Sequence, residues 1–322
     1  MTNSLPATPL VTLHEIRDAA AAIHGHVHRT FQQGSTYLSD ASGANVSLKL
    51  ELFQKTGSFK VRGVINTLRQ LSDIDRKRGV ISLSAGNHAQ ALAWGAARLG
   101  IKATIVMPMN AVASKVAATK AYGGNVIQTN GDLLATALGF KEEHGLALVH
   151  PFDDPRVIAG QGTVGLEIFE DVPDVDVVIV ACGGGGLISG VAAAIKQLKP
   201  NVRVIGVEPE GANAMKLSLE AGSPQRLAKM NTIADGLAAP FAGTSNFEHV
   251  KAYVDEMLVI PDTEIIAGMR ALMERCKLFV EPSAGAAVAP LLNGSLSFTK
   301  GERVVPIVCG GNIDLERLRT LI

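Results

Sequence analysis

Cysteine is scarce in this chain, and the few cysteines form no recognisable pattern. Cys182, Cys276 and Cys309 are the three cysteines among 322 residues, and they make neither a Cys-x-x-Cys pair nor a zinc-type spacing. An odd number of cysteines also argues against the disulfide framework of a small secreted protein. We therefore expect a protein of the reducing cytoplasm.

The chain also lacks net charge and long hydrophobic runs. Its 30 lysines and arginines balance 30 aspartates and glutamates, so no overall field favours a nucleic acid or an anionic membrane as partner. No apolar run reaches the roughly 18–20 residues that span a bilayer. Met1–Val11 has no basic segment followed by an apolar run, so we expect no secretory leader. A small molecule is the expected partner.

Glycine, in contrast, is abundant. The chain has 33 glycines and is 47% hydrophobic, which fits a compact protein of one large or two ordinary domains with tight turns. Thr12–Ile23 predicts a helix with a capping box, because Glu15 follows Thr12 at the required spacing.

Beyond this helix, apolar runs alternate with helical patterns. The expected strands are Asn45–Leu52, Gly79–Leu83, Ala103–Met107, Asn125–Thr129, Ala147–His150, Asp176–Ala181, Val202–Val207, Glu256–Ile260 and Val304–Val308. The expected helices among them include Asn87–Leu99, Ser114–Tyr122, Leu133–His144, Thr163–Phe169, Asn213–Glu220 and Asp262–Lys277. Phe152–Gly162 is polar and contains proline, so we place a domain boundary near it. The alternation favours an α/β fold with parallel strands and helical crossovers.

A lone lysine, Lys60, stands in the first turn of another expected amphipathic helix. Ser58 is of the right type and in the right position to be its N-cap. The helix dipole and apolar neighbours both disfavour a protonated amine there. A neutral lysine amine is the nucleophile that forms an imine with an aldehyde. A solvated surface lysine is the alternative interpretation, and this residue alone does not decide between the two.

Four consecutive glycines, Gly183–Gly186, follow an apolar strand and precede a helix that begins at Leu187. Such a junction directs backbone N–H groups and a helix dipole at one place, which suits a phosphate dianion. The spacing matches neither the dinucleotide pattern nor the P-loop pattern. A tight turn without a ligand remains the alternative.

Ser84-Ala85-Gly86-Asn87-His88 lies at a second junction between a strand and a helix. Its hydroxyl, its amide and the free N–H groups of the helix start can converge on a carboxylate. Ordinary helix capping explains the same residues, so both interpretations stay open.

Cys309-Gly310-Gly311-Asn312 follows the last expected strand. Ligands of open α/β sheets gather at such strand ends, which makes Cys309 a candidate contact. A small buried thiol of no chemical role is the alternative.

Together, these motifs resemble the serine/threonine dehydratase branch of the fold-type II pyridoxal-phosphate enzymes. The matching stretches are Lys55–Gly63, Ser84–Gln90, Gly183–Leu187 and Cys309–Asn312, and with the pattern between them the resemblance covers nearly the whole chain. It implies the tryptophan synthase beta-like fold: two open, twisted, mostly parallel sheets with helices on both faces. It also implies a large cofactor-binding domain, residues 1–77 and 151–322, and a small substrate-carboxylate domain, residues 78–150.

The resemblance gives each motif a role. Lys60 would hold pyridoxal 5'-phosphate as an imine and, once released, act as the base at the substrate Cα. The implied cofactor contacts are Phe59, Lys60, Asn87, Gly183, Gly184, Gly185, Gly186, Leu187 and Cys309. The implied substrate contacts are Ser84, Ala85, Asn87 and His88. Cys309 would face the pyridine nitrogen, and a neutral thiol there favours β-elimination over a long-lived carbanion.

Two positions depart from the pattern of relatives. Ala85 stands where relatives that racemise serine have a serine, which supplies the proton donor on the opposite face. Glu208 and the Ala212 carbonyl match a divalent-cation site, but Ala214 replaces one of its carboxylates, so we expect no metal site.

We therefore expect a dehydratase of small L-β-hydroxy amino acids, with threonine and serine as the first substrates, that acts as a homodimer or homotetramer. Dehydration of 3-hydroxyaspartate or a bulkier hydroxy amino acid, β-replacement and serine racemisation are rival activities. A module that binds a nucleotide or effector without catalysis is the alternative from another class.

Overall fold

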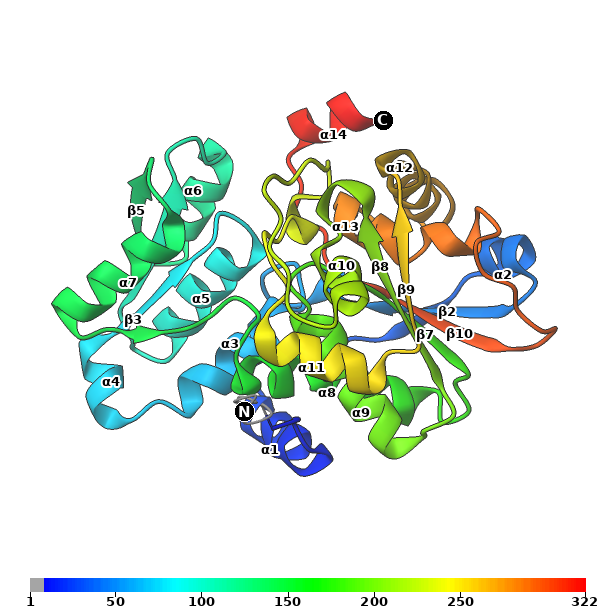
Figure 1. Cartoon of the computed structure of the whole chain (residues 1–322), viewed down its shortest axis with the longest axis horizontal. Coiled ribbons are helices and arrows are strands. Elements are labelled where there is room, and N and C mark those ends of the chain that lie inside the picture. The colour runs from blue at the N-terminus through cyan, green and yellow to red at the C-terminus, as the bar shows by residue number, and fades with distance from the viewer. Residues whose placement is uncertain (1–8) are drawn as a thin grey trace.

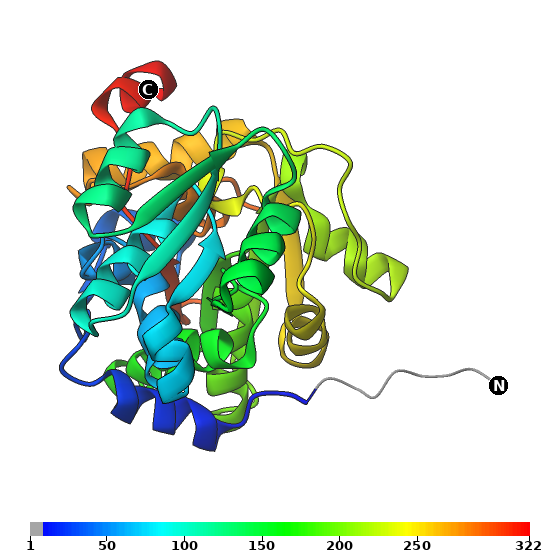
Figure 2. The same ribbon diagram turned by 90° about the vertical axis from the view of Figure 1, so that its left-hand side faces the viewer.

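A computed structural model describes residues 9–322 of the protein, so most of Met1–Val11 lies outside it. The described chain forms two separate sheets, which lie in the left and right parts of Figure 1. Helices cover both parts, and the view turned by 90° in Figure 2 shows α1, Leu13–Ile23, running beneath them. The expected α/β fold with two mostly parallel sheets is confirmed. Within residues 9–322, no helix is both long and apolar enough to cross a membrane.

The larger sheet has six strands in the order β1-β2-β10-β7-β8-β9. Its strands are β1 Gln32–Gly34, β2 Asn45–Leu50, β7 Val177–Ala181, β8 Arg203–Pro209, β9 Glu256–Ile260 and β10 Arg303–Val308. Only the pairing of β1 with β2 is antiparallel in this sheet. The side chains of β7 are all buried, as expected for a central parallel strand covered on both faces.

The smaller sheet has four parallel strands in the order β5-β4-β3-β6. Its strands are β3 Val80–Leu83, β4 Ala103–Pro108, β5 Asn125–Thr129 and β6 Ala147–Leu148. All four lie within residues 78–150, and the larger sheet takes its strands from both sides of that range. This distribution supports the division into two domains, which stays a proposal.

Most expected helices form, with ends that differ by a few residues. The other helices are α2 Thr36–Ser42, α3 Lys60–Arg69, α4 Asp73–Arg78, α5 Asn87–Arg98, α6 Ala113–Ala121, α7 Leu133–His144, α8 Pro155–Asp171, α9 Gly186–Leu198, α10 Ala214–Ala221, α11 Thr244–Tyr253, α12 Asp262–Arg270, α13 Pro282–Ala286 and α14 Leu315–Leu321. The capping box of α1 is confirmed, because Thr12 and Glu15 each accept a backbone N–H from the other. The helix expected over Asp262–Lys277 changes to a π-helical turn at Ala271–Arg275.

The expected break at Phe152–Gly162 is wrong over most of its length, because α8 already begins at Pro155. Asp154 caps this helix and proline occupies its first turn, where a missing N–H costs nothing. Gly160 is not a helix breaker here. A Cβ at Gly160 would collide with the backbone at Gly63 of α3, so the glycine lets the two helices touch.

The expected strand Asn45–Leu52 ends at Leu50, and a short 3-10 turn, Glu51–Phe53, directs Glu51 inward. The Glu51 carboxylate accepts hydrogen bonds from Arg62 of α3 at 2.7 and 2.8 Å, and the Arg62 side chain is fully buried. Arg62 also donates to Glu167 of α8, which pairs with the buried Lys49 of β2. The two positive and two negative side chains of this network balance, and they join α3 to β2 and α8.

We expect Arg62→Met to lower the free energy of unfolding by about 3–5 kcal/mol, because it leaves the Glu51 carboxylate buried without its partner. Arg29 is the matched control, since it is half exposed and also pairs with two carboxylates, Glu170 and Asp171. Arg29→Met should cost at most about 1 kcal/mol. Urea unfolding followed by circular dichroism measures both, and equal losses would contradict the assigned role of the buried network.

Candidate active site

The helix that carries the candidate lysine, α3, begins at Lys60 itself, and Phe59 takes the cap position without a side-chain cap bond. The expected N-cap role of Ser58 is wrong. Ser58 instead pairs with Gly310 in an isolated antiparallel bridge, and its buried hydroxyl has no hydrogen-bond partner in the structure. The bridge holds residue 58 in an extended pairing outside the helix.

This bridge is part of a longer contact between the lysine segment and the chain after β10. The Phe59 N–H donates to the Cys309 carbonyl at 3.2 Å, and the Gly311 N–H donates to the Gly57 carbonyl at 2.9 Å. Gly57 has a φ of 73°, and a Cβ there would collide with the Asn312 side chain. Only glycine meets both demands, so the motif's glycine is explained by close approach.

Lys60 is half-buried, and its Nζ donates a hydrogen bond to the Pro151 carbonyl at 2.9 Å. Burial lowers the pKa of Lys60 to about 8, and the nearby Cys309 and Glu281 oppose the shift only in part. The amino end of α3 adds to the effect, because its dipole also disfavours a cation. A large share of the amine is therefore neutral near pH 8, which favours the nucleophile over a solvated surface lysine.

Cys309 directly follows β10 and is 3% exposed. Burial raises the pKa of its thiol, and the negative charge of Glu281 raises it further. The thiol is therefore neutral, as we expect of the residue that faces a pyridine nitrogen.

The Ser84 motif joins β3 to α5. The Ser84 hydroxyl accepts the Gly86 N–H at 3.1 Å, and Asn87 is the first residue of α5, so its N–H has no partner within the helix. The buried His88 ring contacts Ser82 and the Val149 carbonyl, away from these N–H groups. Burial lowers the pKa of His88 to about 3, so the ring is neutral and structural.

The side-chain amide of Asn87 connects the part of the chain with the four-stranded sheet to the part with the six-stranded sheet. Its Nδ2 donates to Glu281 Oε1, and its Oδ1 accepts from Asn312 Nδ2, both at 2.8 Å. The structure thus brings the Ser84 motif and the Cys309 motif into direct contact.

The glycine motif joins β7 to α9, and it contacts the segment that holds Lys60. Gly185 has a left-handed φ of 98°, so a residue with a Cβ would be strained there. A Cβ on Gly184 or Gly186 would collide with Phe152, the residue after Pro151. The first hydrogen bond of α9 runs from the Ser189 N–H to the Gly185 carbonyl. The N–H groups of α9 before Ser189 therefore have no partner within the helix. Leu187 is buried in the main core.

Four contact residues were absent from the sites expected from sequence: Pro151, Phe152, Glu281 and Asn312. Asn312 stood in a matched motif and was the easiest to find. Pro151 and Phe152 lie in the stretch interpreted as a break, and Glu281 has no motif around it. Their roles arise from contacts between residues 32 to 256 positions apart, for which a single sequence carries no local signal.

Glu208, which matches a metal ligand of some relatives, lies near the end of β8, and its buried side chain reaches the start of α10. Its carboxylate accepts the N–H groups of Met215 and Lys216 at 3.0 and 2.8 Å, so it caps this helix. Burial raises its pKa to about 8 despite these two bonds. Within residues 9–322, no three His, Cys, Asp or Glu side chains gather as a metal ion would require.

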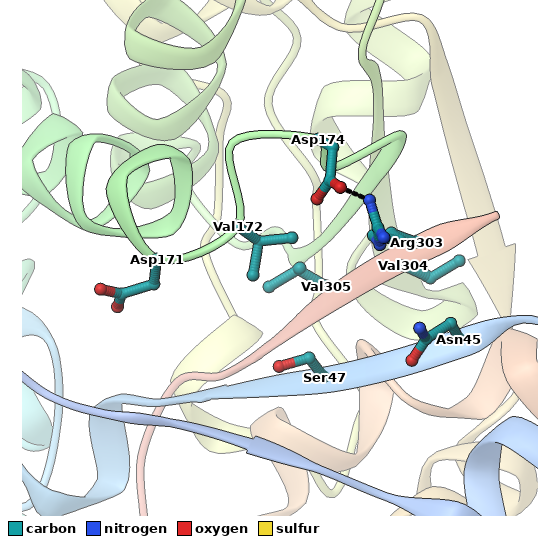
Figure 3. Close-up of a pocket in the computed structure, with 8 residues that line it drawn as sticks. All are labelled: Asn45, Ser47, Asp171, Val172, Asp174, Arg303, Val304 and Val305. Atoms are coloured by element: carbon teal, nitrogen blue, oxygen red, sulfur yellow. Dashed lines mark ion pairs between the residues drawn. The ribbon is translucent and has the colours of Figure 1, made fainter. Parts of the chain in front are cut away.

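A surface pocket of about 270 Å³ lies elsewhere, at the amino ends of β2 and β10. Figure 3 shows Asp174 and Arg303 facing each other at its rim as an ion pair. The motifs follow the carboxyl ends of β7 and β10, so this pocket lies at the opposite edge of the sheet from the candidate active site.

Comparison with known proteins identifies the family. The model of the pyridoxal-phosphate dependent enzymes matches residues 23–310. The chain belongs to this family. Pyridoxal phosphate is therefore its cofactor.

Individual relatives cover nearly the whole chain. It is 46% identical to the L-threonine ammonia-lyase of Thermotoga maritima over 97% of this chain and 78% of that one. It is 41% identical to the catabolic L-threonine dehydratase of Escherichia coli K12 over 96% and 95% of the two chains. Maize serine racemase superposes with a TM-score of 0.93 at 40% identity, over 97% of each chain.

The lowered pKa of Lys60 predicts its chemical reactivity. In apoprotein treated with trace acetic anhydride, acetylation of Lys60 should rise with pH, reach half its plateau near pH 8 and then level off, because the neutral amine reacts. Mass spectrometry of the peptide measures the rate. In urea-unfolded protein, the rate should keep rising through pH 10. A rise through pH 10 in the folded protein as well would contradict the burial of this amine.

Proposed function

We propose that this protein is a pyridoxal-phosphate-dependent ammonia-lyase that dehydrates small L-β-hydroxy amino acids. L-Threonine would give 2-oxobutanoate and ammonia, and L-serine would give pyruvate and ammonia. The lyase activity of its relatives, at 41–46% identity, supports this assignment. The observation that carries it is the Lys60 amine, which is neutral in part near pH 8 and lies near Cys309. It donates to the Pro151 carbonyl, and the next residue, Phe152, packs against the glycine turn.

The residues of the candidate site fit the cofactor. The glycines Gly183–Gly186 leave little room for a Cβ, and the start of α9 presents free N–H groups, as a phosphate dianion requires. Phe59 and Cys309 border Lys60, and Asn87 offers its amide beside them. We assign Phe59, Lys60, Asn87, Gly183–Leu187 and Cys309 to cofactor binding.

When bound, pyridoxal phosphate supplies a conjugated ring that stabilises negative charge at the substrate Cα. Lys60, as a neutral amine, takes the α-proton. The pKa of about 8 suits this task, because the amine is then often unprotonated at working pH and still basic. If the pyridine nitrogen of the bound cofactor faces Cys309, the neutral thiol would leave it largely unprotonated, which would favour loss of the β-hydroxyl group.

The substrate carboxylate would bind at the start of α5. The Ser84 hydroxyl and the N–H groups of Asn87 and His88 supply donors there, and the helix dipole favours an anion. Ala85 adds no polar atom to this turn. His88 contributes through its backbone, because its ring is buried against Val149.

Serine racemisation is the second candidate, favoured by the structural similarity to maize serine racemase. Racemisation needs acid–base groups on both faces of the substrate, and Ala85 provides none on the side opposite Lys60. Dehydration of 3-hydroxyaspartate remains a rival within the same chemistry, since the donors named here would bind only the α-carboxylate, which all of these substrates share. Among the contacts described, no side chain is specific to racemisation or to 3-hydroxyaspartate.

We further propose that the protein works in the cytoplasm as a homodimer or homotetramer. Its three cysteines are all buried and unpaired, which fits a reducing compartment. Nucleic acid and membrane are not expected partners, because the formal net charge is zero.

We expect Lys60→Ala to abolish turnover of L-threonine and the adduct between protein and cofactor that borohydride reduces, because the variant has no amine at this place. Release of 2-oxobutanoate and the visible spectrum with and without L-threonine measure both effects. Lys55→Ala, in the same motif, is the control and should keep both. An adduct that survives in Lys60→Ala would contradict the assignment, as would a wild-type protein whose spectrum ignores both L-threonine and L-serine.

We expect the wild-type enzyme to form pyruvate from L-serine far faster than D-serine, because Ala85 cannot return a proton on the second face. Chiral chromatography at partial conversion measures the ratio. Ala85→Ser should raise the D-serine fraction, and Ala85→Gly is the control that adds no hydroxyl. Comparable rates of D-serine and pyruvate formation in the wild type would contradict this role for Ala85.

A further inference from the structure

Glu281 is a buried carboxyl group inside the candidate site, and the proposed mechanism leaves it without a role. It is 7% exposed and directly precedes α13. Its N–H donates to the Gly310 carbonyl at 3.3 Å, and a Cβ on Gly310 would lie 2.7 Å from Glu281 Oε1. The carboxyl is therefore pressed against the turn after β10, and Asn87 Nδ2 donates to it at 2.8 Å.

The contacts of Asn87 leave its amide one orientation. The nitrogen faces the acceptor Glu281, and the oxygen faces the donor Asn312. Rotating the amide by 180° would set donor against donor at Asn312 and acceptor against acceptor at Glu281. Asn312 is itself fixed, because its Nδ2 also donates to the Thr56 carbonyl at 2.7 Å.

We propose that Glu281 is a positioning residue, whose carboxylate fixes the Asn87 side chain across the boundary between the two sheets so that the remaining N–H of its amide is presented to the cofactor. The proposal rests on the proposed function, because it deepens the role assigned there to Asn87. Glu281 acts through Asn87, whose second amide proton has no partner among the described contacts.

Titratable groups from several elements face this carboxyl. They are Lys60 of α3, Cys309 after β10, Lys115 of α6 and Asp235. Lys115 and Asp235 pair at 3.0 Å, so their effects on Glu281 largely oppose each other. Burial is the dominant cause and raises the pKa of Glu281 to about 7, while the bond from Asn87 and the charge of Lys60 lower it only in part.

The strength of the bond between Glu281 and the Asn87 amide therefore depends on pH. Above pH 7 the ionised carboxylate is a strong acceptor for the amide, and below it the neutral acid is a weaker one. Cofactor affinity should be highest above pH 7. Stability follows the opposite direction: a carboxyl whose pKa is raised on folding stabilises the fold at low pH and loses that contribution as pH rises through 7.

Glu281→Gln tests the proposal, because it keeps an acceptor oxygen and removes the charge. We expect its dissociation constant for pyridoxal phosphate, titrated into apoprotein at pH 8, to be about tenfold weaker than wild type, from the loss of one charge-assisted bond. Both proteins should bind the cofactor more weakly as pH falls to 6, because Lys60 becomes protonated. The wild type should lose more affinity than the variant, so the tenfold difference between them should disappear at pH 6. Thermal melts of both apoproteins add a second measure: Glu281→Gln should gain stability relative to wild type between pH 5.5 and pH 8.

Two controls separate the positioning of Asn87 by Glu281 from a general weakening of the contacts between the two sheets. Asp314→Asn removes another carboxylate that crosses the same boundary, where it accepts from Ser114 at 2.8 Å, and it should leave the cofactor affinity and its pH dependence unchanged. In an Asn87→Ala background, Glu281→Gln should have no further effect on affinity. An equal affinity loss in Asp314→Asn, or an undiminished Glu281→Gln effect without Asn87, would overturn the proposal.

These outcomes are distinct from failure of the proposed function. If wild type binds pyridoxal phosphate and releases 2-oxo acid while Glu281→Gln shows wild-type affinity at every pH, the role of Glu281 is wrong and the lyase stands. If wild type binds the cofactor but turns over neither threonine nor serine, the lyase assignment fails, and the affinity measurements still decide the role of Glu281.

Discussion

The pairing of the lysine segment with the turn after β10 is the contact on which the site depends. Through the bridge between Ser58 and Gly310, it ties residues about 250 positions apart, and it starts α3 at Lys60 beside Cys309. Without it, Lys60 would be an ordinary lysine near a helix end. With it, the amine is buried against Pro151, and its pKa falls to about 8. A backbone pairing between distant segments thus places the Lys60 amine where burial lowers its pKa.

Two further constraints keep this pairing in place. Behind α3, Arg62 fixes the helix to Glu51 and Glu167 through a balanced set of buried charges, two residues from Lys60. In front, Asn87 binds Glu281 and Asn312, so the start of α5 is held against the same turn. The candidate lysine therefore lies between a buried ionic network and a polar contact between the two sheets. The second includes Glu281, whose pKa burial raises to about 7.

The glycines of the site act for different physical reasons. Gly57 combines a left-handed backbone with close approach to Asn312, and Gly185 is left-handed where β7 turns into α9. Gly160, inside α8, is a contact point between helices. Residue type alone does not separate these cases, because each is decided by which neighbour the missing Cβ would have met.

Much of the fold follows from the sequence alone, since alternating apolar and helical patterns record local preference and burial. The capping box at Thr12, the central strand β7 and the order of the motifs could all be predicted. The sequence also singles out Lys60 as the candidate nucleophile, which stays a prediction. Tertiary contacts decided the rest. Ser58 pairs with Gly310 and does not cap, α8 extends back to Pro155, and Glu281 enters the site from a stretch without a motif. Local pattern fixes which residues can react; contacts between distant segments fix their protonation and their orientation, because burial and hydrogen-bond partners are properties of the folded chain.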